Sequence, residues 1–172
     1  MHTKNFILFV FILSSQLNLF AQRIENKIIT RHTNLGIQYF VLPQKGLRSG
    51  KSSLEFDQTT FVGQDSVRVG ITMKSPIAMN ADSLLILSGG EVLKSYAVKP
   101  LFLEFKNKKW ESRIFFSATQ EEVIRFFGFE VAPLVVVSDK DNRIELEIKK
   151  RKWLKMTELN TAIYQQINLN KR

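Results

Sequence analysis

The sequence predicts a mainly β protein of the α+β class, with an antiparallel β-sandwich or open barrel, one short helix and a C-terminal amphipathic helix. Three observations predict this class. Short apolar segments separated by Gly, Pro and Ser recur between residues 37 and 116. The periodicity changes after Ser117, and an apolar stripe with helical spacing closes the chain.

The first 21 residues are predicted to be a secretory signal peptide. Lys4 lies before Phe6–Leu13, an unbroken run of eight apolar residues, and a more polar stretch follows up to Ala21. The run is far shorter than the roughly 20 residues that cross a bilayer. We therefore expect cleavage after Ala21, with residues 22–172 forming a single β-rich domain that has no transmembrane segment.

Seven strands are expected from the alternation of apolar and polar residues, which is clearest from Val67 to Met73. The other six candidates are Ile37–Leu42, Leu54–Val62, Leu84–Leu87, Val92–Val98, Leu101–Phe105 and Trp110–Phe116. The segment Pro43–Ser53, rich in Gly, Ser and Lys, is predicted to be a long loop.

A short helix is expected after Thr119, because an N-cap residue is followed by a carboxylate at the capping-box position, Glu122. Gly128 is expected to end it. A β-hairpin is then predicted from Leu134–Val137 and Arg143–Ile148. In the C-terminal helix the apolar stripe consists of Trp153, Met156, Leu159, Ile163 and Ile167, and residues 168–172 are expected to be a frayed tail.

Composition excludes several chemistries. The chain has no Cys, which removes disulfides, thiolate metal sites, iron–sulfur clusters and cysteine nucleophiles. With 25 Lys and Arg against 16 Asp and Glu, the chain carries a formal charge of +9 and favours anionic partners. Nucleic acid is a poor candidate for an exported protein.

Three local patterns resemble chemical sites but fit simpler roles. The stretch Gly46–Ser52 has three residues between its glycines, whereas a phosphate-binding loop has four. Asp139, Asp141 and Asn142 resemble the start of a calcium loop but suit a hairpin turn better. His32 lies in a polar stretch and is expected in an exposed loop. No catalytic residue, cofactor or metal is predicted.

Two basic clusters are the candidate binding residues, and each lies next to a tryptophan. The first consists of Lys106, Lys108, Lys109 and Trp110, and the second of Lys149, Lys150, Arg151, Lys152 and Trp153. Cations attract an anionic polysaccharide, lipid head groups or an acidic protein surface, while the indole supplies contact area. The alternative is that the lysines only solvate the surface and both indoles face the core.

The signal ending Phe20-Ala21-Gln22, together with the order of strand, helix, hairpin and terminal helix over residues 110–167, resembles small secreted β-rich proteins of Bacteroidota. The resemblance implies a periplasmic or secreted location and transfers no catalytic residue.

The leading functional expectation is an exported, non-catalytic binding or structural module of the cell envelope. One alternative is an envelope hydrolase or isomerase whose carboxylates converge only in the fold. The other is a peripheral binder of anionic polysaccharide or lipid. An envelope protein remains a further candidate partner.

Overall fold

The computed structural model describes residues 26–88, 91–128 and 131–169. The predicted signal peptide and its cleavage site lie outside the described residues. Within the described ranges, no helix is long and apolar enough to span a bilayer.

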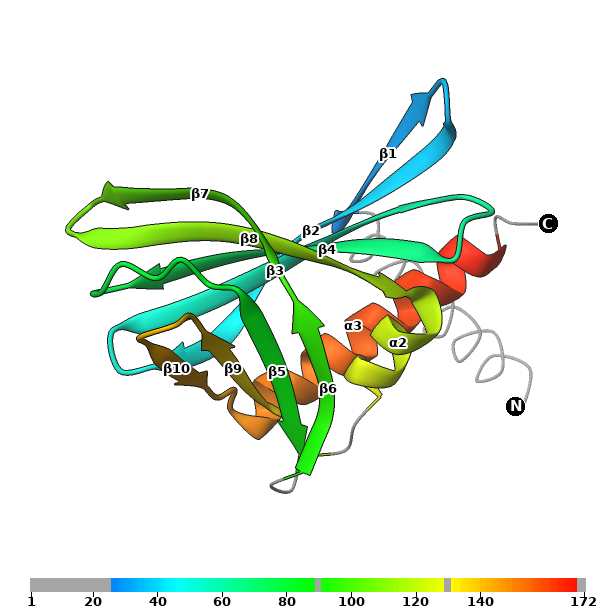
Figure 1. The fold of residues 1–172 in the computed structure, drawn as a ribbon. Coiled ribbons are helices and arrows are strands. Elements are labelled where there is room, and N and C mark those ends of the chain that lie inside the picture. The colour runs from blue at the N-terminus through cyan, green and yellow to red at the C-terminus, as the bar shows by residue number, and fades with distance from the viewer. Residues whose placement is uncertain (1–25, 89–90, 129–130, 170–172) are drawn as a thin grey trace, which may run out of the picture.

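A six-stranded antiparallel sheet, called sheet A here, forms the largest layer (Figure 1). In spatial order its strands are β1 (Ile28–Thr33), β2 (Gly36–Ser49), β3 (Ser52–Phe61), β4 (Ser66–Ser75), β8 (Lys109–Thr119) and β7 (Lys99–Lys106). Alternate residues of the central strands face the core. Phe56, Ile71 and Ile114, for example, lie in one row across β3, β4 and β8 and are all buried.

A smaller antiparallel sheet, sheet B, contains β10 (Arg143–Leu146), β9 (Leu134–Ser138), β5 (Ser83–Ser88) and β6 (Glu91–Ala97) in that order. The two sheets meet where the backbone of Arg48 exchanges hydrogen bonds of 2.8 and 3.1 Å with Glu147. Gly46 permits this approach, because a Cβ atom there would lie 2.6 Å from Cδ1 of Ile148.

The expected class is confirmed: the protein is mainly β, with two antiparallel sheets and two helices. Each of the seven predicted strands overlaps a strand of the structure, and the predicted hairpin corresponds to β9 and β10. Apart from Val136, the buried apolar residues of both sheets and both helices belong to one hydrophobic cluster.

The predicted loop Pro43–Ser53 is wrong. Strand β2 continues through this segment to Ser49, and only Gly50 and Lys51 form the turn to β3. The pairing register shifts between Val41 and Gln44 and again between Lys45 and Leu47. These bulges interrupt the alternation of side chains, which is why the sequence resembles a loop.

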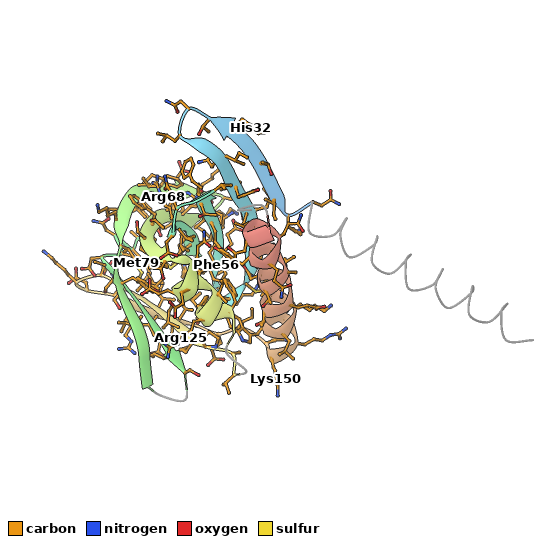
Figure 2. All side chains as sticks on the ribbon, turned by 90° about the vertical axis from the view of Figure 1, so that its right-hand side faces the viewer. His32, Phe56, Arg68, Met79, Arg125 and Lys150 are labelled. Atoms are coloured by element: carbon orange, nitrogen blue, oxygen red, sulfur yellow. The ribbon has the colours of Figure 1, made fainter. Side chains whose placement is uncertain are left out.

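Strand β1 was not expected, because its sequence shows no apolar alternation. It pairs with the first part of β2 to form an arm that projects from the body, with His32 near the tip (Figure 2). His32 is exposed as predicted, but it lies on a strand and not in a loop.

The two helices are α2 (Gln120–Phe127) and α3 (Lys150–Leu169). The capping box is confirmed, since the Glu122 amide donates to Thr119 Oγ1 at 3.1 Å and the Thr119 amide donates to Glu122 Oε2 at 3.0 Å. Gly128 ends α2, with a φ of −81°. The prediction of a frayed tail from residue 168 is wrong at its start, because α3 continues through Asn168 to Leu169. Residues 170–172 lie outside the described ranges.

An aromatic cluster joins the helices to sheet A. Trp153 of α3 is fully buried and stacks on Phe127 of α2, with ring centroids 5.6 Å apart, and it also contacts Phe126 edge-on at 5.3 Å. Phe56 of β3 meets Phe127 in an edge contact at 5.6 Å. Each such ring pair contributes about 1 kcal/mol beyond its buried area.

A buried polar network fixes where α3 lies on sheet A. The Asn160 side chain donates to Gln44 Oε1 at 2.8 Å and accepts from the Gln58 amide at 2.9 Å. Tyr164, one turn further along the helix, donates its hydroxyl hydrogen to Gln58 Oε1 at 2.5 Å. All four side chains are buried, so each depends on the others for hydrogen bonding.

Replacing Asn160 with Ala should lower the free energy of unfolding by about 3 kcal/mol, because it leaves buried amide groups of Gln44 and Gln58 without partners. Urea unfolding measures the loss. Asn168→Ala, an exposed change on the same helix, is the matched control and should stay within about 0.5 kcal/mol of the parent protein. Equal effects of the two changes would contradict the network.

Candidate functional site

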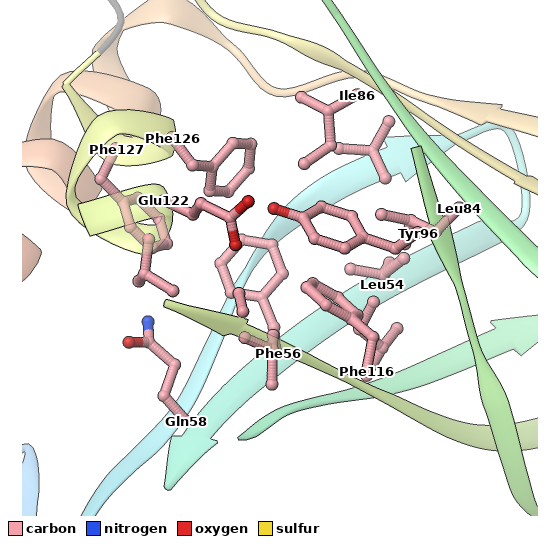
Figure 3. Close-up of a pocket in the computed structure, with 15 residues that line it drawn as sticks. Leu54, Phe56, Gln58, Leu84, Ile86, Tyr96, Phe116, Glu122, Phe126 and Phe127 are labelled. Carbon is pink, nitrogen blue, oxygen red and sulfur yellow. The ribbon is translucent and has the colours of Figure 1, made fainter. Parts of the chain in front are cut away.

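An interior pocket lies between sheet A, sheet B and α2 (Figure 3). Apolar residues of both sheets and of α2 form most of its wall. Phe56 comes from sheet A, Ile86 from sheet B and Phe126 from α2. Gln58 reaches the same wall, so the pocket adjoins the polar network under α3.

Glu122 and Tyr96 are the ionisable residues of this wall. The helix start positions Glu122, whose carboxylate caps α2. Figure 3 shows the Tyr96 hydroxyl pointing from β6 toward that carboxylate. The Tyr96 ring stacks on Phe116, with centroids 4.1 Å apart. Burial, and to a smaller extent the negative charge of Glu122, raises the pKa of Tyr96 to about 12.

The pocket is too small for a metabolite in this conformation. Its volume is about 30 Å³, room for one or two water molecules. Its described wall contains a single carboxylate, Glu122, whereas a glycosidase-type site needs two. The arrangement therefore joins α2 to sheet B, and the described wall holds no pair of carboxylates.

Metal-ligand clusters of three or more His, Asp or Glu side chains do not occur in the part of the chain that the structure describes. The Asp139 segment forms a turn, as expected: Asp139 Oδ1 accepts from the amides of Asp141 at 2.9 Å and Asn142 at 2.7 Å. These hydrogen bonds to the charged carboxylate lower the pKa of Asp139 against the raising effect of desolvation.

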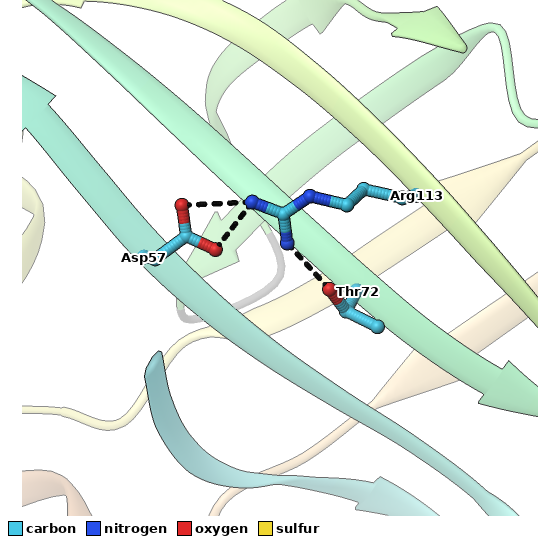
Figure 4. A network of polar contacts seen from close by, with 3 residues as sticks. All are labelled: Asp57, Thr72 and Arg113. Atoms are coloured by element: carbon cyan, nitrogen blue, oxygen red, sulfur yellow. Dashed lines mark hydrogen bonds and ion pairs between the residues drawn. The ribbon is translucent and has the colours of Figure 1, made fainter. Parts of the chain in front are cut away.

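A second cluster of polar side chains, Asp57, Thr72 and Arg113, lies on the outer face of sheet A (Figure 4). Arg113 donates from Nη2 to both Asp57 oxygens, at 3.0 and 2.8 Å, and from Nη1 to Thr72 Oγ1 at 2.6 Å. Burial raises the pKa of Asp57, and Arg113 opposes that shift. A Cβ atom at Gly70 would lie 2.6 Å from Asp57 Oδ1, so the glycine leaves room for this pair. The ion pair is satisfied internally and holds β3, β4 and β8 together.

The two predicted basic clusters do not come together. Lys106, Lys108 and Lys109 surround the β7–β8 turn, whereas Lys149–Lys152 lie at the start of α3, away from that turn (Figure 1). Trp110 is half-buried and contacts Phe105 edge-on at 5.4 Å. Trp153 is buried in the aromatic cluster, so its indole is not available beside the second cluster.

The structure brings further cations to the first cluster. The ends of β2, β3, β4, β8 and β7 lie side by side, and the Lys109 ammonium donates to the Lys51 carbonyl at 2.8 Å. We call the seven cations at this end the basic rim: Lys45, Arg48, Lys51, Lys74, Lys106, Lys108 and Lys109. Strand register unites them, which is why sequence spacing could not.

Only part of the rim charge is neutralised by neighbouring acids. Lys45 pairs with Glu55 at 3.3 Å and Lys74 with Glu111 at 3.2 Å. Among the described residues, Arg48 and Lys108 make no ion pair. A groove of about 210 Å³ lies beside the β2 bulges. Its charged lining residues are Lys45, Arg48, Lys74 and Glu55, and Ser53, Thr72 and apolar residues complete the wall. The groove can therefore receive an anionic group.

The β7–β8 turn holds Lys108 in an unfavourable backbone conformation. Asn107 and Lys108 have φ values of 52° and 61°, the left-handed values that a two-residue hairpin turn requires. Asn tolerates this conformation and Gly is preferred at the second position, whereas Lys there costs about 1 kcal/mol. The cation is present despite that cost.

Comparisons with protein-family models, curated proteins and solved structures find no match to this chain.

The pocket geometry predicts how Tyr96 titrates. An unfolded tyrosine loses its proton near pH 10, while folded Tyr96 keeps it to about pH 12. The stabilisation from the protonated phenol is therefore complete below pH 10 and is lost as the pH rises from 10 to 12. Phenolate absorbance should show a transition near pH 12 that Tyr96→Phe removes, whereas Tyr164, whose pKa burial also raises, titrates later in both proteins.

The variant Glu122→Gln tests the two causes of the shift separately. It should lower the pKa of Tyr96 while leaving it above 10, because burial is the larger cause. A Tyr96 transition near pH 10 in the folded parent protein would contradict the enclosed position of the hydroxyl.

Proposed function

We propose that this protein is an exported, non-catalytic binding module that attaches to anionic polysaccharide of the cell envelope through the basic rim. The observation that carries the proposal is the gathering of seven cations, from the ends of four strands of sheet A and from two turns, beside a groove of about 210 Å³. Export rests on the signal-like segment of residues 1–21 and on the resemblance to secreted proteins of Bacteroidota.

The shape of the rim favours a polymer. Its cations extend from the β2 bulges to the β7–β8 turn, so a chain with repeated carboxylate or sulfate groups can contact several of them together. Arg48 and Lys74 line the groove that would hold one such group, and Lys51 and Lys108 lie at the exposed turns.

Lys108 gives independent support. A turn that tolerates glycine better carries a lysine at a positive φ, which lowers stability and adds charge at the tip. A cation at the tip would attract an anionic polymer, and this contribution to binding would offset the loss of stability.

Charge reversal at the rim provides the first test. The triple variant Lys51→Glu, Lys106→Glu, Lys108→Glu should weaken binding to heparin or alginate at least about tenfold, because repulsion replaces attraction. Binding of the parent protein should also weaken as salt rises. Calorimetric titration measures both effects.

The second basic cluster supplies the matched control. The triple variant Lys149→Glu, Lys150→Glu, Lys152→Glu makes the same change in net charge at the start of α3, outside the groove, and should weaken binding much less than the rim variant. The rim proposal fails if this variant loses binding instead, or if both lose it equally. Vesicles containing phosphatidylglycerol form a second arm, and capture by these vesicles without capture by polysaccharide would also overturn it.

Substitutions at Lys108 separate strain from charge. Lys108→Gly should raise the free energy of unfolding by about 1 kcal/mol and weaken polysaccharide binding. Lys108→Ala removes the same charge but keeps the left-handed strain, so it should weaken binding equally without stabilising the protein. Thermal unfolding combined with titration checks this pair. A glycine variant that is no more stable than the alanine variant would contradict the strain.

A further inference from the structure

Strand β7 is an open edge of sheet A. Within the described residues it pairs with β8 alone, and no strand lies on its other side. Every residue from Lys99 to Lys106 is exposed. The edge therefore presents both its side chains and its outward backbone groups.

The β7–β8 turn determines which backbone groups point outward. In a two-residue hairpin turn the flanking residues, Lys106 and Lys109, form a hydrogen-bonded pair. Hydrogen-bonded and non-hydrogen-bonded pairs then alternate along an antiparallel ladder. Leu103 and Phe105 fall in the non-hydrogen-bonded pairs, so their amide and carbonyl groups point away from β8.

Apart from Glu104, the side chains from Leu101 to Phe105 are apolar, and they lie on both faces of the strand. Leu101, Phe102, Leu103 and Phe105 are 50%, 40%, 38% and 62% exposed. Edge strands usually carry lysines, prolines or bulges that prevent further pairing. Here Lys99, Pro100 and the bulge next to Phe102 lie at one end of β7, and Lys106 lies at the other. Between these ends the strand carries a single charge, Glu104, among four exposed apolar residues.

A lipid surface suits this edge poorly, because inserting it would leave the backbone groups of Leu103 and Phe105 without hydrogen bonds in hydrocarbon. A second copy also suits it poorly. Antiparallel pairing of two β7 strands would bring the lysines of the turn close to Lys99 of the other copy, and parallel pairing would bring the two turns together.

A strand from another protein meets both requirements. Its backbone can pair with the open edge, and apolar side chains at alternate positions can cover Leu101, Leu103 and Phe105. The cations at both ends of β7, Lys99 and the lysines of the β7–β8 turn, complement acidic residues at both ends of such a strand.

We propose that β7 binds an extended segment of a partner protein by β-strand addition, and that this segment is apolar in its middle and acidic at its ends. Sheet A then gains a seventh strand beside β7. This contact runs along the side of the sheet, whereas the groove of the basic rim lies at the ends of β2, β3 and β4, so the two share only the lysines of the β7–β8 turn.

A synthetic peptide with the sequence Asp-Val-Thr-Val-Thr-Val-Asp is the probe. It should bind the purified protein saturably in fluorescence anisotropy and slow hydrogen exchange at the Leu103 and Phe105 amides. The same peptide with Lys at both ends should bind at least about tenfold more weakly. A peptide N-methylated on alternate residues cannot form the ladder and should not bind.

Leu103→Pro tests the edge from the side of the protein. Proline removes an amide that points outward and leaves the pairing with β8 intact, so the variant should fold, bind polysaccharide normally and lose the peptide. If the variant does not fold, the N-methylated peptide and the exchange data decide. Absence of peptide binding, equal binding of the N-methylated peptide, or a dimer that forms through β7 in sedimentation would each overturn the proposal.

Discussion

The fold depends on how the protein satisfies two amides that lie in its core. Gln44 and Gln58 project from the inner face of sheet A among apolar neighbours. A buried amide without hydrogen bonds would destabilise the fold by about 2 kcal/mol. Asn160 and Tyr164 supply the partners, and because they lie one turn apart they fix both the position and the rotation of α3. A purely apolar interface would allow the helix to slide.

The position of α3 in turn determines the interior. Trp153 packs against Phe126 and Phe127, so fixing α3 also fixes α2. The first turn of α2 brings Glu122 opposite Tyr96 of sheet B, which closes the pocket at about 30 Å³. The interior is therefore filled by the protein's own side chains. The surfaces large enough to bind a partner are the groove at the basic rim and the open edge at β7.

The sequence predicted the parts of this arrangement that depend on local signals. The capping box of α2 and the turn at Asp139 are set by side chains within three residues of each other, so both were recognisable. The extension of β2 was missed because two bulges break its alternation. Lys106, Lys108, Lys109 and Trp110 were recognised as a cluster, but Lys45, Arg48, Lys51 and Lys74 join them only through strand register. Periodicity carries no information about register between distant strands.

The rim and the open edge can be used together. The groove lies beside β2 and β3, whereas a partner strand would lie beyond β7, on the far side of β4 and β8. A bound strand would cover the apolar residues of β7, which are a site for aggregation when they stay exposed. It would leave Arg48 and Lys51 free to contact a polysaccharide. A partner anchored in the envelope would then hold the rim close to the polymer, and the two weak contacts would reinforce each other through the raised effective concentration.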